Sequence, residues 1–233
     1  MKNKKTKIAI IDNSINPEVY RPVVHWNQFL DFPSYAFTAR NFEFPDFSSG
    51  YTHLIITGSE ASILERDNWV YREIEVVREA VDSGLSILGS CYGHQLLALA
   101  LFGPDRVSRC KKPELGWFSI PFDSNPLTGK AQVHDVFTSH FDEVVNLPSQ
   151  CRIFAQTADC YVHAFQLENL PIWGIQPHPE ISITEGQQFF KAVIAGGVTD
   201  PDLFQDALDT NPRDSGLIFT LIENFLVSEK SGG

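Results

Sequence analysis

The stretch "ILGSCYGHQLLALAL", residues 87–101, places a cysteine on a corner between two glycines. Small and apolar residues lead into Cys91, and a strongly apolar run with helical character follows it. Gly89 and Gly93 complete a Gly-x-Cys-x-Gly pattern, the thiol form of a nucleophile elbow. A thiol where a helix begins is favoured as the reactive thiolate. The pattern therefore predicts a nucleophile at Cys91, against the alternative of a small buried structural residue.

The segments before this corner alternate between strand and helix patterns. Short apolar runs at 7–13, 51–59 and 85–90 are typical of buried strands. Between the last two, Val70, Ile74, Val77 and Val81 recur at helical spacing, and Gly84 stands where a helix ends. A second helix is expected after Cys91. This rhythm predicts a parallel sheet covered on both faces.

After Phe102 the pattern changes to short β-like runs separated by turn residues. These predict antiparallel strands added at the edge of the sheet, with a hairpin loop at 167–171. Helices are expected at about 184–195, 201–208 and 215–227. The expected fold class is α/β: a three-layer α/β/α sandwich on a flavodoxin-like mixed sheet, forming one domain over residues 1–233. Eight aromatic residues between 29 and 51 are interpreted as packing onto the sheet, with a binding patch as the alternative.

The composition is that of an ordinary globular protein, with 233 residues, 43% hydrophobic and 20% charged. The formal net charge of -11 argues against a nucleic-acid partner. No apolar run is long enough to span a membrane, and the apolar run at the N-terminus stops at Asp12, too short for a signal peptide. None of the four cysteines forms a C-x-x-C pair. We therefore expect a cytoplasmic protein that needs no metal and no cofactor.

A reactive thiol needs a base, and His178 in "WGIQPHPEIS" offers one. Pro179 disfavours a helical conformation at His178. In an extended chain, residues two apart face the same side, so His178 and Glu180 should project together. A carboxylate beside an imidazole fixes its tautomer and stabilises the imidazolium. Cys91, His178 and Glu180 are therefore the predicted nucleophile, base and orienting group, against the alternative of a surface loop with incidental charges.

Over about residues 7–190 the chain resembles the class I, triad-type glutamine amidotransferases. "GSCYGHQ" is similar to the family's nucleophile elbow and "GIQPHPE" to its histidine–glutamate motif. "LIITGS", "PELGWFSI", "SHFDEVVNLP" and "CYVHAFQ" resemble further family segments in the same order. The resemblance implies a hydrolase that cleaves the γ-amide of glutamine, releasing ammonia and glutamate through a γ-glutamyl thioester on Cys91.

The resemblance also implies roles for other residues. The backbone N–H of Tyr92, with one from Gly58 or Ser59, would stabilise the oxyanion. The expected substrate-binding residues are Gln95, His140, Phe141 and Asp142. The substrate would be a small molecule, glutamine or a γ-glutamyl compound, and a separate synthetase protein is a possible partner that receives the ammonia.

Three positions depart from the family pattern. Phe141 replaces a glycine where the family uses main chain to hold glutamine. Glu60 stands where a proline often follows the oxyanion loop, and residues 101–107 lengthen a turn that is usually a glycine pair. The bulk of Phe141 keeps a second function open, a hydrolase of γ-glutamyl peptides or conjugates. A third, a non-catalytic relative, would be expected to lack Cys91 or His178, and both are present.

Overall fold

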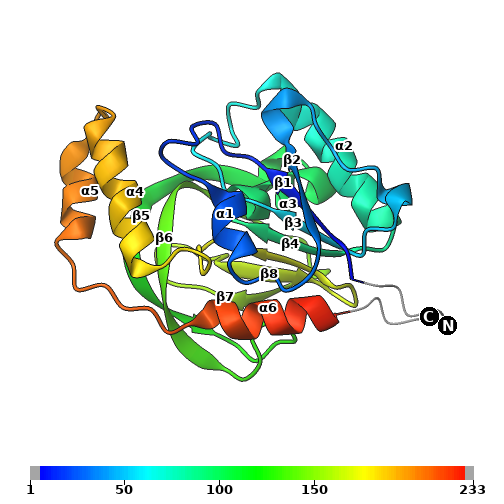
Figure 1. The fold of residues 1–233 in the computed structure, drawn as a ribbon. Helices are drawn as coiled ribbons and strands as arrows, with labels where there is room; N and C mark the ends of the chain where they lie inside the picture. Colours follow the sequence, from blue (N-terminus) through cyan, green and yellow to red (C-terminus); the bar gives the residue numbers. More distant parts are fainter. Residues whose placement is uncertain (1–5, 229–233) are drawn as a thin grey trace.

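Residues 6–228 are described by the computed structural model of this chain, and their strands form one mixed sheet (Figure 1). Its parallel half consists, in spatial order, of β2 (Ser34–Thr38), β1 (Ile8–Asp12), β3 (His53–Ile56), β4 (Ser86–Ser90) and β9 (Ile172–Ile175). The sheet continues with antiparallel β8 (Ala164–Leu167), β7 (Cys151–Ala155), β5 (Val107–Phe122) and β6 (Gln132–Val144). The predicted mixed, flavodoxin-like sheet is confirmed. The expectation that all strands after Phe102 are antiparallel edge strands is wrong for β9, which pairs parallel with β4 inside the sheet and so brings the following segment to the end of β4.

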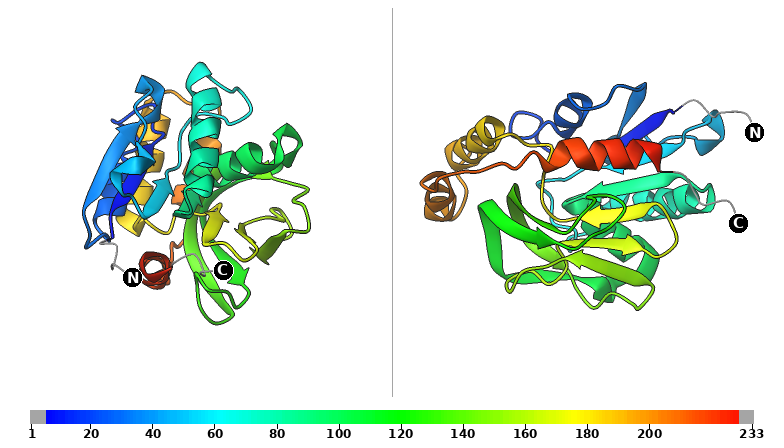
Figure 2. Two further views of the ribbon diagram at one scale, coloured as in Figure 1. Left: turned by 90° about the vertical axis from the view of Figure 1, so that its right-hand side faces the viewer. Right: turned by 90° about the horizontal axis from the view of Figure 1, so that it is seen from below.

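Helices cover both faces of the parallel half (Figures 1 and 2). One face carries α1 (Pro22–Asn27) and α6 (Leu217–Val227), and the other carries α2 (Asn68–Asp82) and α3 (Tyr92–Phe102). The strand side chains alternate accordingly: in β1, Ile8 and Ile10 pack in the core under α6, and Ala9 and Ile11 in the core under α2 and α3. The result is the expected three-layer sandwich.

Two further helices, α4 (Ile183–Ala195) and α5 (Pro201–Leu208), lie side by side at one end of the molecule (Figure 1). They pack through Phe190 and Phe204 against Leu115 and Phe137 of β5 and β6. A capping box of Ser182 and Glu185 starts α4, with both reciprocal hydrogen bonds formed. Three short 3₁₀ helices complete the described chain, at Ala39–Asn41, Phe47–Ser49 and Pro104–Arg106.

The glycine-flanked corner is a point of backbone contact. A Cβ atom on Gly93 would lie 2.2 Å from the Ile56 carbonyl oxygen of β3, and one on Gly89 would lie 2.4 Å from that of Gly93. Neither position has room for a side chain, because α3 crosses directly over the ends of β3 and β4. The expectation that these glycines permit a close approach of strand and helix is confirmed.

Every predicted helix and strand before Phe102 is present, with bounds shifted by a few residues at most. The hairpin at 167–171 joins β8 to β9 as expected. Of the eight aromatic residues between 29 and 51, five pack on the core: Phe29, Phe37, Phe44, Phe47 and Tyr51. Phe32, Tyr35 and Phe42 are exposed, so packing accounts for only part of that segment. No helix among residues 6–228 is long and apolar enough to cross a membrane.

One buried carboxyl group makes the stability of the fold depend on pH. Glu73 of α2 is 0% exposed, and burial raises its pKa to about 8, against a smaller lowering by the Asn13 side chain. Because the folded protein holds this proton more tightly than the unfolded chain, stability falls as pH rises from about 4.5 through about 8.

We expect Glu73→Gln, which imitates the neutral carboxyl group, to remove that loss. Thermal unfolding followed by circular dichroism should give similar Tm values for both proteins near about pH 5, and a Tm higher for the variant by on the order of 5 °C near about pH 8.5. Glu75→Gln, on the exposed side of the same helix, is the control and should change Tm little. A Tm difference that does not grow with pH would contradict the argument.

Candidate active site

Cys91 stands at the end of β4 with a strained backbone. Its φ of 49° and ψ of -104° are rare for a residue with a side chain. Two hydrogen bonds hold it there: its N–H donates to the carbonyl of Ile175 at 2.8 Å, and its carbonyl accepts from the N–H of Gln95 at 3.0 Å. The corner therefore joins β9 to the first turn of α3 and points the thiol toward the ends of the parallel strands.

His178 follows β9 and is paired with Glu180. Its N–H donates to the Phe137 carbonyl of β6 at 2.8 Å, and its Nδ1 lies 2.8 Å from Glu180 Oε1. The predicted pairing is present, but the extended conformation that we expected is wrong. Residues 178–181 form a turn, closed by the Ile181 N–H donating to the His178 carbonyl at 3.2 Å, and this turn brings the carboxylate back onto the ring.

The electrostatics of this group favour a charged imidazole. Burial alone lowers the pKa of His178, but Glu180 and Cys91 outweigh it and raise the pKa to about 10. A side-chain hydrogen bond between His178 and Cys91 contributes to the rise. At neutral pH the ring is therefore protonated, beside the carboxylate on one side and the sulfur on the other. Such an arrangement stabilises a thiolate.

Tyr20 is a member of this group that the sequence did not indicate. Its hydroxyl donates to Glu180 Oε1 at 3.2 Å and lies 3.3 Å from His178 Nδ1. The turn that carries it is held by Glu60, whose carboxylate accepts from the N–H groups of Ile15 and Asn16 at 3.1 and 3.0 Å. Glu60, which stands where the family often has a proline, therefore has a structural role. No local pattern around Tyr20 distinguishes it from an ordinary aromatic residue.

Tyr92 and Ser59, two of the residues expected to stabilise the oxyanion, line the same cavity as Cys91. Tyr92 is the first residue of α3, where N–H groups have no partner within the helix. Ser59 lines the cavity next to Cys91. Gly58 is in closest contact with the base: a Cβ atom there would lie 2.5 Å from His178 Cε1 and 3.0 Å from the Tyr20 hydroxyl. The loop after β3 therefore has room for His178 only because residue 58 is glycine.

A cavity of about 270 Å³ opens beside Cys91. Its polar wall includes Ser62, Gln95, Arg109 and Asp142, and its apolar wall consists of Phe141, Phe189, Val193, Val198 and Phe204. The Asp142 carboxylate accepts from the Ser62 hydroxyl at 2.6 Å and pairs with Arg109 at 3.1 Å. The cavity is thus polar toward α3 and the sheet, and apolar toward α4 and α5.

The four expected substrate-binding residues all border this cavity, but the three polar side chains among them, that of Asp142 included, are already engaged. Gln95 Nε2 donates to the Asp142 carbonyl at 2.7 Å and to Gln176 Oε1 at 3.2 Å. The His140 ring is turned toward Glu114, 2.9 Å away. Phe141 is 38% exposed and packs its ring against Phe204 of α5.

The other three thiols are held in their neutral form. Burial raises the pKa of Cys110 and of Cys151 to about 12, and it raises that of Cys160 further. Nearby carboxylates add to each shift. At neutral pH these thiols are protonated, so they are poor nucleophiles.

Residues 10–196 match the sequence model of the family described as glutamine amidotransferase class-I. The chain belongs to this family. Among solved structures, the fold is shared with a glutamine amidotransferase from Thermotoga maritima, with a TM-score of 0.74 over 96% of this chain and 99% of that one, at 18% sequence identity. At that identity the similarity shows the fold alone.

Two curated relatives of this amidotransferase chain are closer in sequence. A glutamine-hydrolyzing GMP synthase subunit of Pyrococcus furiosus is 38% identical over 59% of this chain and 66% of its own length. Gamma-glutamyl-L-1-hydroxyisopropylamide hydrolase of a Pseudomonas species is 32% identical over 57% of this chain and 48% of its own length. The chain thus spans less than two thirds of the length of these relatives.

The contact between Gly58 and His178 can be tested through the thiol. In Gly58→Ala the added methyl group must displace the imidazole from Cys91, so the thiolate loses its stabilising partner. We expect the rate of Cys91 alkylation by iodoacetamide, followed by mass spectrometry at neutral pH, to fall at least about tenfold. Gly196→Ala is the control, since a Cβ atom there meets no atom closer than 3.4 Å.

Circular dichroism of Gly58→Ala should first show an intact fold. An unchanged alkylation rate in the folded variant would mean that His178 does not support the thiolate. In the wild-type protein Cys91 should react before the three neutral thiols.

Proposed function

We propose that this amidotransferase-family chain hydrolyses the γ-amide of glutamine with Cys91 as nucleophile. The observation that carries the proposal is the His178–Glu180 pair, whose atoms lie 2.8 Å apart, beside the Cys91 thiol at the end of the parallel strands, where ligands bind in such sheets. A non-catalytic relative would have no need of a protonated imidazole held against a thiol on a strained corner.

The proposed chemistry follows from these positions. The Cys91 thiolate attacks the γ-carbonyl carbon, and the oxyanion accepts hydrogen bonds from the Tyr92 N–H and from Gly58 or Ser59. As the C–N bond breaks, His178 gives its proton to the departing ammonia, leaving a γ-glutamyl thioester. Water then attacks the thioester and gives a proton to His178, the C–S bond breaks, and glutamate leaves with the thiolate and the protonated imidazole restored. Glu180 keeps the His178 ring oriented throughout.

We expect mutation of His178 and mutation of Glu180 to lower kcat/KM for ammonia release by different factors. His178→Ala removes both the base and the proton donor, so kcat/KM for ammonia release should fall by on the order of 10⁴. Glu180→Ala should cost less than the roughly 10⁴ known for an orienting aspartate of a serine protease. The reason is that Tyr20 remains 3.3 Å from the ring nitrogen and the nucleophile is a thiol.

The measurement is coupled detection of ammonia, with Cys91→Ala as the inactive reference and circular dichroism to confirm folding. Tyr20→Phe in the Glu180→Ala background should lower the rate further, because the second orienting contact is then lost. A folded Glu180→Ala as inactive as His178→Ala would overturn the assignment of an orienting role.

A second function, hydrolysis of γ-glutamyl conjugates with an apolar amine portion, is favoured by the apolar wall of the cavity. Phe141 and Phe204 lie side by side in this wall with ring centroids 6.2 Å apart and planes tilted by 45°, and Val198 adds to the same wall. Val198 and Phe204 lie beyond residue 196, outside the segment that matches the family. The Pseudomonas relative, named as a hydrolase of a γ-glutamyl amide, supports this second function.

Phe141→Gly distinguishes the two substrates. If the ring obstructs the amino-acid end of free glutamine, the wild type should show a KM for glutamine above about 1 mM, and the variant a lower one. Loss of the aromatic contact should raise the KM for γ-glutamyl-p-nitroanilide. Phe219→Ala, an exposed aromatic residue on α6, is the control. A wild-type KM for glutamine well below about 1 mM would show that Phe141 is no obstacle.

If glutamine is the better substrate, we propose that the ammonia passes to a separate synthetase protein. The archaeal relatives from Pyrococcus furiosus and Thermococcus kodakarensis, named as glutamine-hydrolyzing subunits of GMP synthase, support that partner class. A location in the cytoplasm and the absence of a nucleic-acid partner remain predictions from composition.

A further inference from the structure

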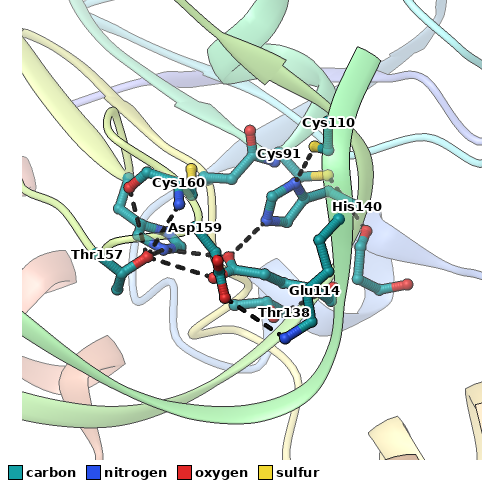
Figure 3. Close-up of polar contacts among 12 residues, drawn as sticks. Cys91, Cys110, Glu114, Thr138, His140, Thr157, Asp159 and Cys160 are labelled. Atoms are coloured by element: carbon teal, nitrogen blue, oxygen red, sulfur yellow. Dashed lines mark hydrogen bonds and ion pairs between the residues drawn. The ribbon is translucent and has the colours of Figure 1, made fainter.

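A second group of chemically reactive side chains lies behind the cavity and takes no part in the proposed reaction. It consists of Glu114 on β5, His140 on β6, and Cys160 and His163 in the segment between β7 and β8. Each of the four residues is at most 3% exposed. One ligand atom from each lies within 4.8 Å of all the others. Figure 3 shows Glu114, His140 and Cys160 around one centre, with Cys91 and Cys110 close by.

Both imidazoles of the group have their Nε2 atom close to the same oxygen of the Glu114 carboxylate. His140 Nε2 lies 2.9 Å and His163 Nε2 lies 3.1 Å from Glu114 Oε2. The other carboxylate oxygen, Oε1, accepts from the Thr157 hydroxyl at 3.4 Å. One oxygen of the carboxylate is thus held by a neighbouring hydroxyl, and the other faces two ring nitrogens.

The hydrogen bond made by His140 Nδ1 determines whether Nε2 of the same ring carries a proton. His140 Nδ1 lies 3.1 Å from the Asp142 carbonyl oxygen, which can only accept a hydrogen bond. If Nδ1 carries the proton, Nε2 of a neutral ring has a lone pair that faces a carboxylate. A cation between them would resolve this conflict. Histidines that bind metals commonly donate the other N–H to a backbone carbonyl in this way.

Cys160 supplies the group with sulfur. The residue is only 1% exposed, its own N–H is bound to Thr157 Oγ1 at 3.1 Å, and its sulfur has the backbone of Val162 as hydrogen-bonding neighbour. Two imidazoles, a thiol and a carboxylate are the donor types that Zn²⁺ takes in tetrahedral sites.

We propose that Glu114, His140, Cys160 and His163 bind one divalent cation of the zinc type. With bond lengths of about 2.0–2.3 Å, the ligand atoms of a tetrahedral zinc site lie about 3.5 Å apart. The two short nitrogen–oxygen distances and the 4.8 Å spread bracket that value, so small side-chain rotations close the site. The thiol gives up its proton on binding.

Four protein ligands leave no open position, so this is a structural site. It would tie the loop between β7 and β8 to β5 and β6. His140 is next to Ser139, whose carbonyl lies 3.8 Å from Cys91 Sγ, and it precedes Phe141 and Asp142 in the cavity wall. The metal would therefore hold the strand that forms one side of the cavity.

The test uses the full chain with Cys91→Ala, because a thiolate beside His178 could itself bind metal. After treatment with a chelator, the protein is titrated with Co²⁺ and followed by absorption. We expect one equivalent to bind, with tetrahedral d–d bands and a thiolate-to-cobalt charge-transfer band. Mass spectrometry of the untreated protein should find about one zinc per chain.

Cys160→Ser should abolish the charge-transfer band and weaken Co²⁺ binding at least about 100-fold. Cys110→Ser is the matched control and should keep the band, although its sulfur lies 3.4 Å from His140 Nδ1. His163→Gln, which should keep the band but bind less tightly, serves if Cys160→Ser does not fold. The absence of stoichiometric binding, or a band that disappears with Cys110 instead of Cys160, would overturn the proposal.

Discussion

The contact between the backbones of β3, β4 and α3 is the constraint on which the rest of this structure depends. The main-chain atoms at Gly89, Gly93 and Ile56 approach so closely that no side chain fits between them. This approach forces the chain to turn within one residue, and that residue is Cys91. Hydrogen bonds to Ile175 and Gln95 then hold a conformation that an isolated cysteine would not adopt.

The site combines the two halves of the sheet. The parallel half supplies the thiol, and the last parallel strand leads directly into His178. The antiparallel half supports the base, because the His178 N–H is bound to Phe137 of β6. The same strand contributes Asp142, whose main chain is held by Gln95 and whose carboxylate is held by Ser62 and Arg109. Sulfur, imidazole and cavity wall therefore keep their relative positions only while β6 stays in place.

The sequence predicted what depends on local spacing. The elbow, the His178–Glu180 pair, the parallel strands and the C-terminal helices all have short patterns, and each is present. Helix α1 was missed because it is only six residues long, with no apolar periodicity to mark it. Tyr20 reaches Glu180 from 160 residues away, and no local pattern encodes such a contact. The group of Glu114, His140, Cys160 and His163 could not be predicted from the sequence for the same reason. Its four members come from three segments and contain no paired cysteines.

The apolar wall of the cavity has an evolutionary consequence. Cys91, His178 and Glu180 lie in the segment that matches the family. Phe141, Phe189 and Val193 of the apolar wall lie there too, whereas Val198 and Phe204 belong to an appendage that follows it. Helix α4 starts at a self-contained capping box at Ser182, two residues beyond Glu180. Sequence changes farther along α4 and α5 therefore need not disturb the triad. Part of the apolar wall can thus vary without any change in the triad. A lineage could exchange the appendage and acquire a new amine specificity while the catalytic corner stayed unchanged.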